Sequence, residues 1–95
     1  MEDAIKLIQK KRLVQAFKGY TPFHDDKLIN GELIDYALQH LAEHKDNLQE
    51  INSTSDTLKS LHIYEVMSTL AHAAACIVAE MGRLERLDER ISNKT

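Results

Sequence analysis

The sequence predicts an all-α protein, and three observations support this fold class. Apolar residues recur at helical spacing over three long stretches of the chain. Only one proline and three glycines occur among 95 residues. Residues that favour turns gather at two places, "KGYTP" and "INSTSD". A chain of this length forms one domain, which we expect to span residues 1–95.

The first helix is expected over residues 2–18. Gly19 follows it directly and is the usual residue for a left-handed C-terminal cap. The apolar residues of this segment fall close to one helical face, and they are Ala4, Leu7, Ile8, Val14 and Phe17.

The second helix is expected over residues 25–50, after Pro22. Asp25 and Asp26 suit its first turn because carboxylates face the positive end of the helix dipole. Gly31 interrupts the helix at a cost of about 1 kcal/mol relative to alanine. An apolar heptad seam runs along it through Ile34, Ala37, Leu41, His44, Leu48 and Ile51.

The third helix is expected over residues 55–90, with Ser55 as its N-cap and a frayed tail over 91–95. Its centre, "HAAAC", carries small side chains that allow another backbone to approach closely. The two seams predict a long antiparallel hairpin of the second and third helices, with the first helix packed on it and a second chain completing the core as a homo-oligomer. The third helix has its seam at Ile63, Met67, Leu70, Ala74, Ile77, Met81 and Leu84.

The net charge of −3 is unevenly distributed along the chain. Residues 1–20 carry five basic and two acidic groups, whereas residues 21–56 carry two basic and eight acidic groups. This distribution argues against binding of a DNA or RNA polymer, which requires a broad basic face. A small anion near the N-terminal segment is compatible with it.

The single cysteine, Cys76, excludes an intramolecular disulfide, and its alanine-rich surroundings predict a buried thiol. The N-terminal segment has no apolar core of the signal-peptide type, and we expect no membrane span. The cytoplasm is therefore the expected location.

The histidines suggest a metal site only weakly. His40 and His44 lie one helical turn apart and could share a zinc ion, but a third strong ligand is missing. His62 and His72 on the third helix are interpreted as interface or solvated residues. No metal site is expected.

Catalytic patterns are equally sparse. Glu85 and Asp88 resemble half of the magnesium site of all-α nucleotide pyrophosphohydrolases, but the second helix has no Glu-x-x-Glu partner. The alternating charges from Glu85 to Arg90 indicate a solvated, salt-bridged face. The sequence has no Ser/His/Asp arrangement, glycine-rich phosphate loop or Cys-x-x-Cys motif. We expect a protein that is not an enzyme and needs no cofactor.

The stretch "KGYTP" is the most informative one for function. Tyr20 lies between a helix C-cap and a proline, so its ring has a limited sweep and can offer its face to a nucleobase. Lys18 lies beside it and Lys27 follows, and both are candidates for binding phosphate. The alternative is a turn whose tyrosine ring closes the end of the hairpin.

"KGYTP" and "HDDKL", followed by a helix, a turn and "LAHAAACIVAE", resemble the small phage anti-CBASS sponge proteins. The resemblance covers the layout of residues 18–80. It implies an all-helical oligomer that sequesters cyclic oligonucleotide messengers without cleaving them, with the tyrosine stacked on a base. Gly19 and Tyr20 match the family pattern directly.

Other family positions differ in this sequence. Asp35 stands where the resemblance implies a lysine, and Tyr64 is the only hydroxyl near the position where an arginine and a threonine are expected. The cluster Lys10, Lys11 and Arg12 is proposed to supply the positive charge from an adjacent subunit.

The leading hypothesis is therefore a non-enzymatic, phage-type immune antagonist that holds cyclic di- or trinucleotides at subunit interfaces, in the host cytoplasm if phage-encoded. The alternative is a helical inhibitor or adaptor that binds a host protein and has no small ligand. Candidate ligand-binding residues are Lys11, Arg12, Lys18, Gly19, Tyr20, Lys27 and Tyr64.

Overall fold

The computed structural model describes the backbone of residues 3–53 and 56–93 and the side chains of residues 3–45 and 63–93. Within these ranges every regular element is a helix, which confirms the all-α class. Ser55 and the side chain of His62 lie outside the described part, so the expectations about them have no structural counterpart here. The helices are α1 (Ala4–Phe17), α2 (Pro22–Asp25), α3 (Glu32–Ser53) and α4 (Asp56–Asn93).

α1 lies within the predicted range, and local hydrogen bonds close both of its ends. The Asp3 side chain accepts a hydrogen bond from the Lys6 N–H at 3.0 Å, which satisfies one free donor of the first turn. At the other end Gly19 adopts a φ of 97°, a left-handed conformation that glycine takes without steric cost. The Tyr20 N–H then donates to the Gln15 carbonyl at 2.9 Å. This bond fixes the position at which Tyr20 leaves the helix.

The predicted helix over residues 25–50 is wrong at its beginning, because a separate short helix precedes a later start. α2 begins at Pro22, and Thr21 is its N-cap. Gly31 adopts a φ of 81°, which a right-handed helix cannot contain, and α3 therefore starts at Glu32. The glycine that we expected to weaken the helix instead separates α2 from α3.

α4 continues to Asn93, so the frayed tail expected over residues 91–95 is wrong for residues 91–93. Its 38 residues give a length of about 57 Å at 1.5 Å per residue, close to the longest dimension of 60 Å. Arg86 and Arg90 near this end form ion pairs with Asp26, just after α2. These tertiary contacts, which the sequence pattern did not show, hold the last turns in place.

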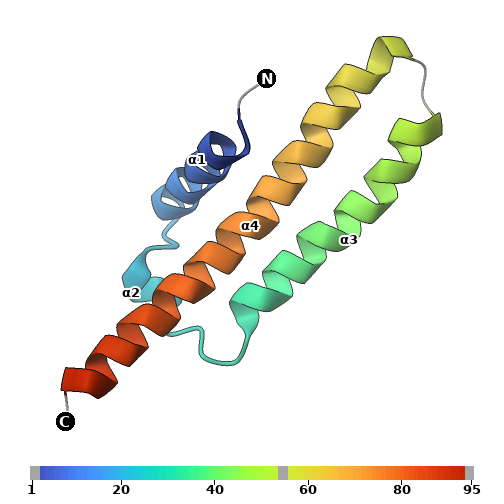
Figure 1. Ribbon diagram of the computed structural model, residues 1–95. Coiled ribbons are helices and arrows are strands. Elements are labelled where there is room, and N and C mark those ends of the chain that lie inside the picture. Colours follow the sequence, from blue (N-terminus) through green and yellow to red (C-terminus); the bar gives the residue numbers. More distant parts are fainter. Residues whose placement is uncertain (1–2, 54–55, 94–95) are drawn as a thin grey trace.

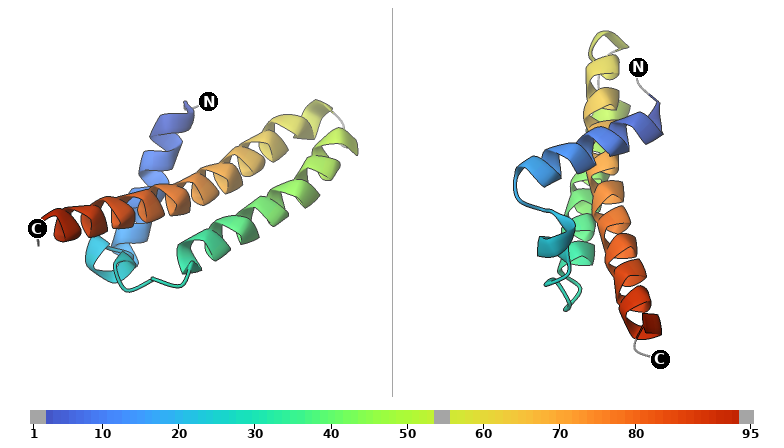
Figure 2. Two further views of the ribbon diagram at one scale, coloured as in Figure 1. Left: turned by 60° about the horizontal axis from the view of Figure 1, so that its bottom comes forward. Right: turned by 90° about the vertical axis from the view of Figure 1, so that its left-hand side faces the viewer.

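α4 is the common packing partner of the other three helices. α3 and α4 lie side by side and run in opposite directions (Figure 1). α1 lies obliquely across α4, and α2 follows close to the end of α1 (Figure 2). The end of α1, α2 and the first turns of α3 therefore gather around one region of α4.

Small side chains form most of the core. Ala37, Ala73 and Cys76 make a buried cluster where α3 meets α4, so the cysteine is buried as predicted. Alanines at this contact let the two backbones approach closely, in agreement with the expectation from "HAAAC". Further buried apolar residues are Leu7, Leu33, Val66, Ala71, Ala75 and Ala79.

Most large residues of the predicted heptad seams are not in this core. Within residues 32–45 of α3 the buried residues are Leu33 and Ala37, whereas Ile34 and Leu41 are exposed. Ala37 of the expected seam is therefore in the core, whereas Leu33 and not Ile34 is the buried residue one turn before it. On α4 five seam residues stay on the surface, namely Ile63, Leu70, Ile77, Met81 and Leu84.

By length and composition alone, the part of α4 from Ile63 to Asn93 is long and apolar enough to cross a membrane, contrary to our expectation from the sequence. The core helix of a soluble protein passes the same test, and 33% of the apolar window is buried inside this protein. α1, α2 and α3 all contact α4.

Candidate ligand-binding site

A cavity of about 300 Å³ lies where α1, the first half of α3 and the middle of α4 meet. Its volume is at the lower end of the range for small-molecule pockets, about 300–1,000 Å³. We call it the Tyr20 cavity, and it is lined by Lys11, Arg12, Val14, Gln15, Lys18, Tyr20, Asp25, Leu33, Tyr36, His40, His72, Cys76 and Ala79.

Four of the predicted ligand-binding side chains line this cavity: Lys11, Arg12, Lys18 and Tyr20. The Tyr20 ring is 38% exposed, and it makes an edge-to-face contact with the His24 ring at a centroid distance of 5.0 Å. The ring is thus held on one side and accessible on another. Gly19 contributes through its backbone, because its left-handed conformation ends α1 immediately before the tyrosine.

Lys27 and Tyr64, like Gly19, are predicted residues that do not line the cavity. The Lys27 ammonium lies 4.4 Å from the centroid of the Phe23 ring, in a cation–π contact. Tyr64 is exposed on α4, two turns before His72. Asp35, which stands where the family resemblance implied a lysine, is exposed on α3 and is likewise absent from the lining.

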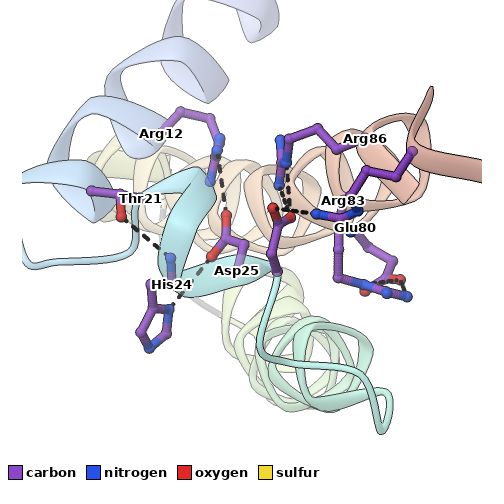
Figure 3. Close-up of polar contacts among 9 residues, drawn as sticks. Arg12, Thr21, His24, Asp25, Glu80, Arg83 and Arg86 are labelled. Carbon is purple, nitrogen blue, oxygen red and sulfur yellow. Dashed lines mark hydrogen bonds and ion pairs between the residues drawn. The ribbon is translucent and has the colours of Figure 1, made fainter. Parts of the chain in front are cut away.

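Asp25 is the cavity residue whose environment the sequence did not reveal. Its side chain is only 1% exposed, whereas the sequence indicated only a carboxylate in the first turn of a helix. The nearest basic side-chain atoms are the Arg12 Nη2, 3.8 Å from Oδ2, and the His24 Nδ1, 3.6 Å from Oδ1 (Figure 3). Both distances exceed hydrogen-bonding range, and neither carboxylate oxygen has a hydrogen-bond partner in the described part of the chain.

Arg12 is oriented by a polar chain along the cavity wall. Its Nη1 donates to the Gln15 Oε1 at 2.9 Å, and the Gln15 amide donates to the Cys76 sulfur at 3.6 Å. Burial raises the pKa of the Cys76 thiol, and the Gln15 hydrogen bond offsets only part of this effect. The thiol therefore stays protonated near neutral pH and acts as a packing and hydrogen-bonding group.

His40 and His72 form a stacked pair on the cavity wall, with ring centroids 3.9 Å apart and planes 20° from parallel. Desolvation, followed by the charges of His40, Lys11 and Lys18, lowers the pKa of His72 below its ordinary 6.5. His72, interpreted from the sequence as an interface or solvated residue, lies on the cavity wall and is partly buried. Among residues 3–45 and 63–93 no group of three metal-ligating side chains is close enough to hold an ion.

The charge of the lining is positive overall. Lys11, Arg12 and Lys18 contribute three positive charges and Asp25 one negative charge, which leaves +2 with neutral histidines. A cavity with this charge and with accessible aromatic rings suits a ligand that is anionic in one part and planar in another.

Next to the cavity, Asp26 fastens the end of α2 to the C-terminal part of α4. Arg86 donates to Asp26 Oδ1 through Nε at 2.8 Å, and its Nη2 lies 2.8 Å from the same oxygen; Arg90 Nη1 lies 3.4 Å from Oδ2 (Figure 3). We call these three residues the Asp26 clamp. Desolvation opposes ionisation of Asp26, but the Arg86 and Arg90 interactions outweigh it and hold its pKa below 3.8.

The clamp adds tertiary partners to the charged face expected from Glu85 to Arg90. Its two arginines reach across to α2 instead of pairing only along α4. Glu85 and Asp88, compared above with a magnesium site, are exposed. One turn earlier, Glu80 and Arg83 form an ion pair within α4 (Figure 3).

In comparisons with protein-family models, with curated proteins and with solved structures, the chain matched none.

Proposed function

We propose that the protein is a non-enzymatic binder of a cyclic di- or trinucleotide, which it sequesters in the Tyr20 cavity. The observation that carries the proposal is the presence of an accessible tyrosine ring and three cationic side chains around one cavity. The ring offers a stacking surface for a base, and the cations offer partners for phosphates. Sequestration requires only affinity and a sufficient number of sites, so the proposal assigns no acid–base role to any residue.

The proposal includes a homo-oligomer built on the antiparallel pair α3 and α4. Ile77, Met81 and Leu84 form an exposed apolar stripe at heptad spacing, with Met81 58% exposed. A cavity of about 300 Å³ is also small for a whole cyclic dinucleotide, so a second copy would supply the remaining wall. Sedimentation velocity tests this part, since Met81→Glu should convert the oligomer to a monomer. A wild-type protein that sediments as a monomer at all concentrations would contradict it.

Calorimetric titration with a panel of cyclic di- and trinucleotides tests binding. Base stacking of about 1–3 kcal/mol means that Tyr20→Ala should weaken binding about 5- to 150-fold. Tyr20→Phe keeps the ring face and should retain most of the affinity. Tyr64→Ala is the matched control, because Tyr64 is an exposed tyrosine outside the cavity lining. Absence of binding across the whole panel would refute the proposed function.

The alternative is a helical protein that binds and inhibits a host protein without a small ligand. Two large aromatic side chains near the α1–α2 junction favour it: Phe17 is 85% exposed and Phe23 is 75% exposed. Exposed aromatic rings are common in the central contacts of protein interfaces. A flat response across the nucleotide panel from a folded protein, together with a host partner that Phe17→Ser no longer binds, would support this alternative.

A further inference from the structure

The buried Asp25 carboxylate has unused hydrogen-bonding capacity inside the Tyr20 cavity. The side chain is 1% exposed, lines the cavity, and has no hydrogen-bond donor for either oxygen among the residues that the structure describes. Buried charges in proteins are normally both paired and hydrogen-bonded. Arg12 at 3.8 Å lowers the electrostatic cost, but neither Arg12 nor His24, at 3.6 Å, donates a hydrogen bond at these distances.

The group that Asp25 would bind must donate hydrogen bonds. The position of Asp25 relative to Tyr20 follows from the contacts of His24. The His24 ring contacts the Tyr20 ring on one side, and its Nδ1 lies 3.6 Å from Asp25 on the other. The carboxylate therefore lies one side chain away from the proposed stacking ring. Tyr20 and Asp25 line the same cavity, so a base stacked on Tyr20 would lie in the cavity that Asp25 also lines.

We propose that Asp25 selects guanine as the base held in the Tyr20 cavity, an inference that rests on the proposed function. The Watson–Crick edge of guanine carries two adjacent donors, N1–H and N2–H₂, which match the two oxygens of an ionised carboxylate. Adenine offers N6–H₂ next to the N1 acceptor, and cytosine offers N4–H₂ next to the N3 acceptor. Uracil and thymine offer one donor between two carbonyl acceptors. A carboxylate would meet a lone pair on each of these other bases.

The remaining charges agree with this division of roles. Lys11 and Lys18 line the same cavity and are available to phosphates, while Asp25 reads the base edge. A carboxylate in a cavity for an anion would otherwise only weaken binding. The presence of the Asp25 carboxylate is explained if it accepts hydrogen bonds from the uncharged base of the ligand.

The first test uses the wild-type protein and varies the ligand. Calorimetric titration should give binding of cyclic di-GMP that is about 5- to 150-fold tighter than that of cyclic di-AMP, the range for one bidentate base contact. Cyclic di-IMP, which lacks only the 2-amino group, should bind more weakly than cyclic di-GMP. GMP is included as a control, because it carries the same guanine base as cyclic di-GMP but lacks the cyclic backbone. It should show the same preference over AMP at lower affinity.

The second test changes the protein. Asp25→Asn replaces two acceptors by one acceptor and one donor, a pattern that matches adenine, so the preference should reverse towards cyclic di-AMP. Asp26→Asn is the matched control: it removes the same charge one residue later, outside the cavity lining, and should leave the guanine preference intact. Both variants are compared by thermal melting, so that a folding defect is recognised.

The outcomes separate the inference from the proposed function. Equal affinities for cyclic di-GMP, cyclic di-AMP and cyclic di-IMP would overturn the proposal that Asp25 selects guanine. They would leave the proposed sequestration function intact. A guanine preference that survives in Asp25→Asn would also overturn the selection by Asp25. If no cyclic nucleotide binds, the proposed function fails and the selection fails with it.

Discussion

We expect Asp26→Ala to destabilise the protein by about 1–2 kcal/mol. The Asp26 side chain is 21% exposed and that of Arg86 is 32% exposed, so the pair is partly buried. Exposed ion pairs contribute about 0.2–1 kcal/mol, whereas removing one partner of a buried pair costs about 3–5 kcal/mol. The clamp lies between these cases. Arg90, at 3.4 Å and 52% exposed, adds little to it.

The assay is thermal and urea unfolding at one fixed protein concentration, since an oligomer would make the midpoint concentration-dependent. A loss of 1–2 kcal/mol corresponds to a midpoint about 5–15 °C lower for a domain of this size. Asp88→Ala is the control: it removes an exposed carboxylate from the same end of α4 and should change stability by less than about 0.5 kcal/mol. An unchanged midpoint in Asp26→Ala would refute the reasoning, and so would strictly additive effects of Asp26→Ala and Arg86→Ala.

The pH dependence gives an independent check of the clamp. Because the folded protein holds the pKa of Asp26 below 3.8, the carboxylate stabilises the fold at pH values above 3.8. This contribution is lost as the pH falls below 3.8 through the lowered pKa. The difference in unfolding free energy between wild type and Asp26→Ala should therefore be constant near neutral pH and should shrink in acid. A difference that grows on acidification would contradict the assignment.

Two further outcomes are expected from single substitutions. Gly31→Ala should cost about 1–2 kcal/mol in urea unfolding, because φ is 81° there and no atom within 4 Å adds a clash. Gly82→Ala, inside α4, gains helix propensity but brings its Cβ to 3.2 Å from the Arg86 Nη1, at the end of a flexible side chain, so it should cost less than Gly31→Ala. Equal effects of the two substitutions would count against the left-handed assignment. His72→Gln should flatten the pH dependence of stability. The lowered pKa of His72 makes wild-type stability fall as the pH drops below 6.5, by at most about 1.4 kcal/mol per pH unit. An unchanged slope in the variant would show that other groups are responsible.

Local sequence signals determined the helical class and several helix ends. The apolar periodicity predicted three long helices, and α1, α3 and α4 correspond to them. Gly19 was identified as the cap of α1 because a left-handed residue is a local requirement that glycine meets. Local chemistry also indicated Tyr20 and its basic neighbours, and four of the candidate residues line the same cavity.

Only the tertiary structure decided which faces are buried and which charges meet. The seams were predicted from heptad spacing, and Ala37 is a seam residue that is buried, but α4 contributes Ala73 and Cys76 from outside its predicted seam, because small residues permit the closest approach of the backbones. Asp25 and Asp26 are neighbours with the same charge, yet one is enclosed beside Arg12 and the other reaches Arg86, sixty positions along the chain. The order of residues sets the local conformation of each segment. The environment of a carboxylate depends on distant segments that folding brings together, so the residues next to it in the sequence do not predict it.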